Sequence, residues 1–465
     1  MNKCDGMTDK KQLYHLLLST TLSSFLTPFL GSAVNVALPV MAGDLAMTAL
    51  TLNWVASSFI LAAAITLVPL GRLADIYGRK KIFLYGALIF TLASFLCIWS
   101  PNQFFLIFVR AVQGIGGAMI FSTGTAMLIS AYPLSERGKI LGINIAAVYI
   151  GLTIGPFLGG LLTEQLGWRF IFVFAAALGG MVIVLIRLMV SEEGAASHGE
   201  SFDVAGSLLY AVALFAIMYG FSRLPSLQAG GLIGFGAICL VIFVRQQLKT
   251  AFPLLNINLF LKNRVFAFSN LAALINYSAT FAVTFLLSLY LQQIKMLTPI
   301  EAGSILIAAP LLQAILSPLA GRLSDRFEPR IISSLGMALS VIGLIPLIFL
   351  HSTTGIMCIV FSLVVLGAGF AFFSSPNVNA TMSAVENKFY GVASATLSTM
   401  RLTGQMFSMG ITMLVFAVIL GNRPIAEAGN PLLLKSIKII FIVLAVVCCG
   451  GVFASLARGK VHNEN

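Results

Sequence analysis

Residues 71–80 read Gly-Arg-Leu-Ala-Asp-Ile-Tyr-Gly-Arg-Lys, a polar loop between two long apolar runs. Its first part returns 250 residues later as Gly-Arg-Leu-Ser-Asp at 321–325. Glu136 returns as Glu386 at the same spacing, again in the loop after the fourth apolar run of its half. Two landmarks at one spacing predict duplicated halves, an arrangement typical of transporters whose site lies between the repeats.

The composition around these loops places most of the chain in lipid. Lys, Arg, Asp and Glu make up 9% of the 465 residues, against about 25% in soluble domains. Hydrophobic residues make up 58%, and the mean hydropathy is +0.98. Since a soluble protein of this size needs far more polar side chains on its surface, cytosolic enzymes, secreted disulfide scaffolds and disordered proteins are excluded.

A membrane-spanning helix needs about 20 mainly apolar residues, and the chain contains fourteen such runs. They lie near 14–40, 50–71, 82–100, 103–132, 139–163, 168–190, 204–222, 229–248, 265–294, 301–320, 331–350, 354–382, 391–420 and 434–457. We therefore expect an all-α polytopic membrane protein with two six-helix bundles and two inserted central helices. The expected domains are an N-terminal bundle over 1–190, two extra transmembrane helices with linkers over 191–263, and a C-terminal bundle over 264–465.

The basic residues predict the orientation. Most of the 28 Lys and Arg fall in the tails and in the loops on the same side as the tails. The exceptions are Arg169, Arg223, Lys295, Arg423, Lys435 and Lys438 on the other side, with Arg110 and Arg401 inside spans. By the positive-inside rule, the chain is an integral protein of the plasma (inner) membrane with both termini cytoplasmic.

The loop at 71–80 resembles the signature G-x-L-a-D-x-x-G-R-[KR] of the major facilitator superfamily. This resemblance implies the major facilitator fold, and a cytoplasmic latch that includes Gly71, Asp75, Gly78 and Arg79. Gly321 and Asp325 are the matching positions of the second copy. A glycine lets two helices approach closely, and an aspartate can interact with a helix N-terminus or a nearby arginine.

Two further motifs carry the resemblance. Arg110-Ala-Val-Gln113-Gly-Ile-Gly is similar to the family's R-x-x-Q-G-x-G in span four. An arginine inside a span costs about 2.5–3.5 kcal/mol to insert, so we expect Arg110 to face protein, water or substrate; the resemblance implies a role in proton coupling or in holding the central cavity. In span five, residues 151–160 match the antiporter motif G-x-x-x-G-P-x-x-G-G, which marks exporters. Its gating positions are Gly151, Gly155, Pro156 and Gly159.

The segment Val34-Asn35-Val-Ala-Leu-Pro39 resembles the fourteen-span drug:proton antiporter branch, as do Phe202-Asp203 and residues 299–303. The branch implies proton-coupled efflux of amphipathic small molecules or drugs by alternating access. Leu30, however, stands where many members carry an aspartate, and the sequence places no carboxylate in mid-membrane. Asp44 and Glu301, at the outer ends of their spans, are the candidate proton carriers. The alternative is proton-independent uptake or exchange of a neutral or anionic metabolite, or of a lipid-like amphiphile.

Polar residues within the spans are the candidates for the lining of a substrate cavity. They are Asn35, Arg110, Gln113, Asn144, Tyr149, Asn270, Asn276, Tyr277, Gln313, Asn377, Asn379, Arg401 and Gln405. The expected partners are a small-molecule substrate, protons and the lipid bilayer. The six cysteines form no C-x-x-C pair and no cluster with histidine, and no G-x-x-x-x-G-K-[ST] is present. We therefore expect no metal, cofactor, ATP, nucleic acid or enzymatic activity.

Overall fold

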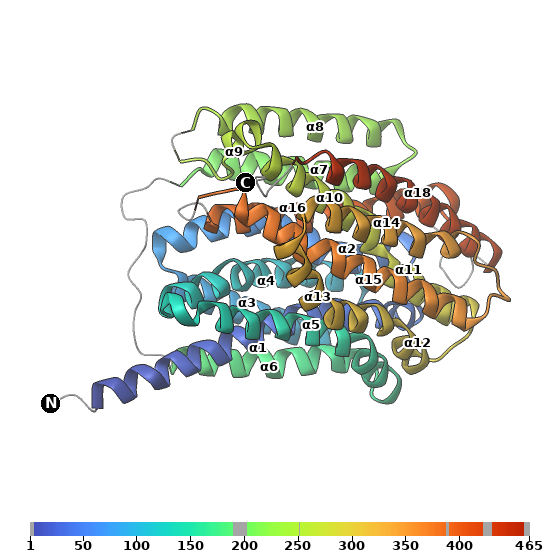
Figure 1. Cartoon of the computed structure of the whole chain (residues 1–465). Coiled ribbons are helices and arrows are strands. Elements are labelled where there is room, and N and C mark those ends of the chain that lie inside the picture. The colour runs from blue at the N-terminus through green and yellow to red at the C-terminus, as the bar shows by residue number, and fades with distance from the viewer. Residues whose placement is uncertain (1–3, 189–201, 251, 387–389, 422–429, 460–465) are drawn as a thin grey trace.

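The computed structural model describes residues 4–188, 202–250, 252–386, 390–421 and 430–459, and in this part of the chain fourteen helices are long and apolar enough to cross a membrane. The first six spans are continuous helices that run roughly parallel to one another (Figure 1). They are α1 (Cys4–Asp44), α2 (Ala49–Tyr77), α3 (Arg79–Ile98), α4 (Gln103–Ala131), α5 (Leu134–Gln165) and α6 (Arg169–Arg187). We call the side where α1 begins the terminal side, and the side where it ends the opposite side.

The last six spans are built from more segments. The first is divided into α10 (Arg264–Thr280), α11 (Ala282–Leu289) and the π-helix η1 (Tyr290–Ile294), and the second into α12 (Pro299–Leu306) and α13 (Ala308–Arg326). The others are α14 (Pro329–Ile348), α15 (Ile356–Ser383), α16 (Tyr390–Ile419) and α18 (Asn430–Leu456).

The helix packing repeats from one set of six to the other. In the first set α1 packs against α5 and α6, α4 against α2 and α3, and α3 against α6. In the second set α10 packs against α16 and α18, α15 against α13 and α14, and α14 against α18. The spacing of 250 residues in the sequence thus corresponds to a repeated arrangement of helices.

Each interruption in the second set has a local cause. Between α12 and α13, Pro310 has no N–H to donate to the carbonyl of Leu306. Between α10 and α11, the N–H of Ala282 donates to the hydroxyl of Ser408 on α16, at 3.0 Å, instead of continuing the helix. The π-helical turn that follows is a geometry found mostly as single turns at functional sites.

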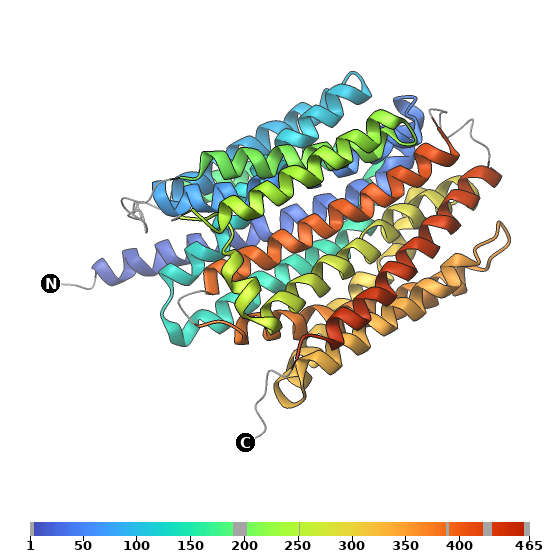
Figure 2. The same ribbon diagram turned by 90° about the horizontal axis from the view of Figure 1, so that it is seen from above.

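The inserted helices α7 (Val204–Arg223) and α8 (Leu227–Gln247) form a hairpin on the flank of the bundle (Figures 1 and 2). Helix α7 packs against α2 and α16, one from each half, while α8 packs mainly against α7. A short helix that the sequence did not predict, α9 (Ile257–Lys262), connects the hairpin to α10.

Asp203 anchors this hairpin. It is the N-cap of α7, where its side chain accepts a hydrogen bond from the N–H of Gly206 at 2.8 Å. It also accepts from Gln247 at 2.7 Å and from Gln246 at 3.2 Å, both on the last turn of α8. Buried Gln247 in turn accepts from the N–H of Leu254 through its carbonyl oxygen.

We expect Asp203→Ala to destabilise the protein by about 2 kcal/mol, because it removes a helix cap and charge-assisted hydrogen bonds. The thermal unfolding temperature of the detergent-purified chain should fall measurably. Asp203→Asn keeps a capping oxygen and should destabilise the protein less than Asp203→Ala does. Equal unfolding temperatures for wild type and Asp203→Ala would contradict the anchoring role.

The prediction of an all-α membrane protein with fourteen spans is confirmed. Most spans are longer than the apolar runs, because the helices continue into polar turns; the first span covers Gln12–Asp44 and the second Ala49–Tyr77. The expected domain boundary at 190/191 falls outside the described residues. That boundary and the one at 263/264 stay predictions.

Candidate functional site

The two halves meet closely on the opposite side through α5 and α12. Gly160 on α5 faces the carbonyl of Pro299, and Gly303 on α12 faces the carbonyl of Pro156. A β-carbon added at either glycine would collide with that backbone oxygen. Small residues that bring helix backbones into contact are the usual means of close packing within membranes, and here they hold the opposite side of the seam between the halves closed.

Hydrogen bonds reinforce this contact. Gln292, in the π-helical turn, donates its amide to the carbonyl of Val36 on α1, at 2.8 Å, and to the hydroxyl of Ser288, at 3.0 Å. Asn53 on α2 donates to the carbonyl of Met409 on α16, at 3.2 Å. Both amides are buried, so moving the halves apart here would expose or orphan polar groups that are now paired.

A second face of α5 carries the antiporter motif. Three of its four glycines lie against α1, and a β-carbon at each would meet α1 atoms. The pairs are Gly151 with Phe25, Gly155 with Ser32 and Gly159 with Ala33. Helix α5 therefore contacts α1 within its own half through these glycines and α12 across the seam through Gly160 and the carbonyl of Pro156.

Deeper in the seam, Tyr277 on α10 is the centre of a polar and aromatic cluster. The guanidinium carbon of Arg401, on α16, lies 5.1 Å from the centre of the Tyr277 ring. Phe370, on α15, contacts the ring edge-on at 5.2 Å between centroids. Tyr277 is buried and Arg401 is half-buried.

The N-terminal half contributes Tyr149 to the same region. Ser317 on α13 donates to the Tyr149 hydroxyl at 3.3 Å. Gln313 lies one turn before Ser317 and is buried, and its carbonyl accepts from Ser317 at 2.7 Å. Gln405 is one turn beyond Arg401 on α16, on the same helix face. Of the residues nominated from sequence, the structure thus brings Tyr277 and Arg401 into contact and places Tyr149 and Gln313 around Ser317.

Arg110 is placed differently, among helices of the N-terminal half. Its Nε donates to the carbonyl of Val55 at 3.2 Å, and its Nη1 donates to Gln113 at 2.5 Å. Gln113 donates onward to Ser94 at 2.7 Å, and the guanidinium lies 4.6 Å from the centre of the Phe59 ring. Arg110 therefore ties α2, α3 and α4 together, with both side chains of the Arg110–Gln113 pair buried.

The remaining asparagines are buried in several places. Asn144 accepts from Ser24 on α1 at 3.0 Å, and Asn377 donates to the carbonyl of Ser269 at 3.1 Å. Asn270 donates to the carbonyl of Phe266 in its own helix. Asn35 lies beside Val36 on α1. Asn276 is fully buried, and neither atom of its side-chain amide has a partner within the described part of the chain, so it is the best placed of this group to bind water or a ligand.

The signature loop forms a compact ion pair on the terminal side. Asp75 accepts from Arg79 Nε at 3.0 Å and pairs with Nη2 at 2.9 Å. Arg79 also donates to Ser130 at the end of α4, at 2.6 Å. Gly78 joins α2 to α3 at a φ of 106°, a conformation that side chains rarely adopt. Gly71 has room for a β-carbon, so its role is not close packing in this conformation.

The second copy uses a different partner. Pro329 occupies the position that corresponds to Arg79, and Asn379 on α15 donates instead to Asp325 at 3.2 Å and to Ser324 at 3.0 Å. The structure therefore places Asn379 on the terminal side, away from the Tyr277 cluster, and its expected role in lining a substrate cavity stays a prediction. Gly321 faces the hydroxyl of Ser375.

The two candidate proton carriers have local structural partners. Asp44 accepts from the indole of Trp168 at 2.8 Å and lies 3.9 Å from the guanidinium of Arg169, which ties the end of α1 to the start of α6. Glu301 forms a capping box with Thr298 at the start of α12. Both acids are solvent-exposed on the opposite side, and neither reaches the Tyr277 cluster in this conformation.

The described carboxylates all lie at helix ends, in loops or in the first turns of α1 before Gln12. Glu164, at the end of α5, accepts from the N–H of Ile300 at 3.0 Å and adds to the closed contact. Arg110 and Arg401 each place a guanidinium inside a described span, Arg110 on α4 and Arg401 on α16.

Residues 20–409 match the sequence model of the Major Facilitator Superfamily. The chain belongs to the major facilitator superfamily. It is 30% identical over 394 residues to the riboflavin transporter RibZ of Clostridioides difficile (strain 630), covering 84% of this chain and 85% of that one. It is 31% identical over 401 residues to the multidrug resistance protein Stp of Mycobacterium tuberculosis (strain CDC 1551 / Oshkosh), covering 85% and 74%.

Solved structures agree with the major facilitator fold. A bacterial homologue of the human lysosomal transporter Spinster, in an inward-facing and unoccupied conformation, superposes with a TM-score of 0.69. Its sequence identity is 16%, and the match covers 96% of this chain and 97% of that one. The chain is thus a secondary transporter of the major facilitator superfamily with a membrane-embedded helical fold.

Sequence reasoning missed several residues of this major facilitator seam. Gln292, Asn53 and Ser317 are polar residues in apolar runs, as the nominated residues are, so the signal was present. The two glycines of the contact between α5 and α12 are harder to recognise in the sequence, because Gly160 ends the recognised motif and Gly303 lies in the other half. Their pairing depends on how the two halves dock, which one helix pattern does not reveal.

Proposed function

We propose that this transporter exports amphipathic small molecules across the plasma membrane by proton-coupled alternating access, with both termini in the cytoplasm. One observation carries the proposal: α5 and α12 close the opposite side of the seam through backbone contacts, and a polar and aromatic cluster lies deeper in the same seam. A site that is closed on one side between two repeated bundles is what alternating access requires.

Export is supported by the antiporter motif and by a relative. The motif glycines pack α5 on α1 while Gly160 and Pro156 contact α12, so α5 can transmit motion between the halves. The relative from Mycobacterium tuberculosis is named for multidrug resistance. The aromatic rings of Tyr149, Tyr277 and Phe370 suit planar amphipathic compounds, which stack on aromatic faces.

A second candidate function is proton-independent movement of a neutral or anionic solute. It is favoured by Arg401 in the cluster and by the absence of a carboxylate from the middle of the described spans. A cationic drug would be repelled by the guanidinium, whereas a carboxylate or an electron-rich ring system would be attracted to it. The relative named as a riboflavin transporter points in the same direction.

Reconstitution in liposomes distinguishes the two. The purified chain would be given a pH gradient, and the internal pH followed while a cationic dye, a neutral amphiphile or riboflavin is added. Proton flux that depends on the added compound supports the antiporter. Movement of a compound with no proton flux supports the second candidate, and the proton would then be removed from the proposed mechanism.

We expect Arg401→Gln to change which charge the transporter prefers. Losing a hydrogen bond to a charged group costs about 1.5–3 kcal/mol, so the apparent affinity for anionic amphiphiles should fall by about tenfold or more, while that for cationic dyes should rise. Arg187→Gln, at the terminal end of α6, is the matched control and should behave as wild type. Unchanged affinities for both classes would contradict contact between Arg401 and the substrate.

A further inference from the structure

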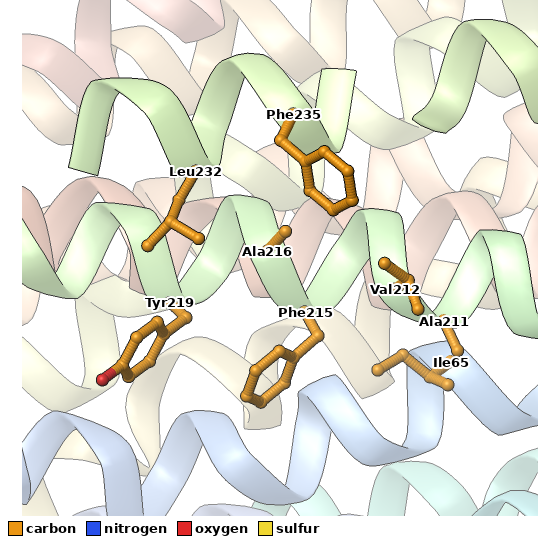
Figure 3. A pocket seen from close by; sticks show the side chains of 8 residues that line it. All are labelled: Ile65, Ala211, Val212, Phe215, Ala216, Tyr219, Leu232 and Phe235. Carbon is orange, nitrogen blue, oxygen red and sulfur yellow. The ribbon is translucent and has the colours of Figure 1, made fainter. Parts of the chain in front are cut away.

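An apolar groove lies outside the seam, between the inserted hairpin and α2. It has a volume of about 450 Å³, within the roughly 300–1,000 Å³ of small-molecule sites. Figure 3 shows Leu232 and Phe235 of α8 extending toward α7, and Phe215 and Tyr219 of α7 extending toward α2, with Ile65 of α2 at one end. Tyr219 supplies the one polar tip among these side chains, so the groove fits hydrocarbon.

The back of the groove is closed. Gly220 and Gly236 bring α7 and α8 so close that a β-carbon on either would meet the partner helix. The groove side chains themselves remain accessible, since Val212 is 44% exposed, Phe215 52% and Phe235 51%. The cavity therefore opens toward the lipid and is separate from the Tyr277 cluster.

The length of the groove matches one leaflet. Its lining on α7 runs from Ala211 to Tyr219, which at a rise of about 1.5 Å per residue is about 12 Å. Half of a hydrocarbon core of about 30 Å is about 15 Å. Arg223 lies one further turn along α7 and ends that helix on the opposite side, where the headgroups of that leaflet lie.

Among the described residues, Arg223 has no acidic partner. Its Nε and Nη2 donate to the Tyr219 hydroxyl at 3.0 and 2.6 Å, and its guanidinium carbon lies 5.1 Å from that ring. Within the described residues Arg223 forms no ion pair, and it is exposed. The tyrosine that lines the groove thus also orients a positive charge at the mouth.

We propose that this groove binds an anionic glycerophospholipid, with one acyl chain between α7, α8 and α2 and the phosphate on Arg223. The apolar lining, the one-leaflet length and the unpaired guanidinium each match a separate part of that molecule. Such a lipid joins the hairpin to α2, because the acyl chain contacts Phe215 and Leu232 on one side and Ile65 on the other.

The test uses the full chain, purified in detergent and stripped of lipid, with binding read by native mass spectrometry. Phosphatidylglycerol and phosphatidylcholine with identical acyl chains are the probes. Wild type should retain one phosphatidylglycerol in preference to phosphatidylcholine. Arg223→Gln should lower the affinity for phosphatidylglycerol about fivefold, the factor expected for one cation at a lipid surface, and lower that for phosphatidylcholine less, because the choline cation offsets the charge of its phosphate.

Two further variants make the result specific. Val212→Phe fills the groove at an exposed position and should weaken binding of both lipids; Ala211→Leu replaces it if that variant does not fold. Lys295→Gln removes a cation at another helix end on the same side and should bind as wild type. The proposal is overturned if Arg223→Gln keeps the wild-type preference, or if filling the groove leaves retention of both lipids unchanged.

Discussion

Valine in place of Gly160 is expected to stop transport while the protein still folds. The β-carbon of any larger residue collides with the carbonyl of Pro299 on α12, so the closed contact on the opposite side cannot form. Overpacking costs about 1–3 kcal/mol, and a bias of that size shifts an equilibrium between two states by roughly five- to 150-fold. The transporter should therefore rest with its opposite side open.

Transport in liposomes and thiol labelling together test this expectation. A cysteine placed at Val36, which is fully buried beside Gln292, in a chain whose six native cysteines are replaced, should react slowly in the parent and quickly in Gly160→Val. Gly180→Val is the control, because a β-carbon at Gly180 meets nothing within 4 Å. Normal transport and slow labelling in Gly160→Val would show that α5 and α12 do not form the gate.

Arg110→Ala is expected to abolish uphill transport, with a loss of at least about 100-fold in accumulation, while the protein still folds. The buried guanidinium costs about 2.5–3.5 kcal/mol to insert, and removing it relieves that cost as the hydrogen bonds to Val55 and Gln113 are lost. Stability should change little. A residue that is costly to bury and gives little net stability is a candidate for function, which here is the coupling of the N-terminal half to the driving gradient.

Two variants distinguish the role of the Arg110 charge from that of the hydrogen bonds that connect the helices around it. Gln113→Ala leaves the charge in place and removes its link to Ser94 on α3, and it should retain more than a tenth of wild-type accumulation. Arg110→Lys keeps the charge without the planar hydrogen-bonding group of arginine. Its accumulation should fall between those of Gln113→Ala and Arg110→Ala. If Gln113→Ala is as inactive as Arg110→Ala, the network acts as a brace between helices, and the coupling role is contradicted.

The sequence was sufficient to predict the number of spans and the duplication of the fold. Fourteen apolar runs, the duplicated Gly-Arg-Leu loops and the motif glycines all reflect local physics, namely the span of a bilayer and the approach of two backbones. Such features are carried by single helices. The packing of α7 against α2 and α16 was not predicted, because a lipid-facing helix has no periodic polar face that reveals its neighbours.

Which polar residues meet could not be predicted either. Asn379 and Tyr277 are both polar residues in apolar helices, and the sequence does not distinguish them. In the structure Asn379 donates to Asp325, whereas Tyr277 contacts Arg401. Arg110 was expected to line the substrate cavity or to act in coupling, which stays a prediction, and the sequence did not reveal that it donates to groups within its own half. These outcomes depend on the rotation of each helix about its axis, and a rotation is fixed by contacts from several neighbours at once.

The interruptions in the second set of spans have a mechanical consequence. The helices α1 and α2 are continuous, although they contain Pro28, Pro39 and Pro69, whereas their counterparts are divided at Phe281 and Ile307, and between these two points lie the π-helical turn and the gate helix α12. Each division lacks one helical hydrogen bond, since the N–H of Ala282 donates to Ser408 and Pro310 has no N–H, and is easier to bend than an intact helix. We expect the two halves to differ in flexibility. The opposite side should open by a bend of a few residues in the C-terminal half before either bundle rotates as a whole.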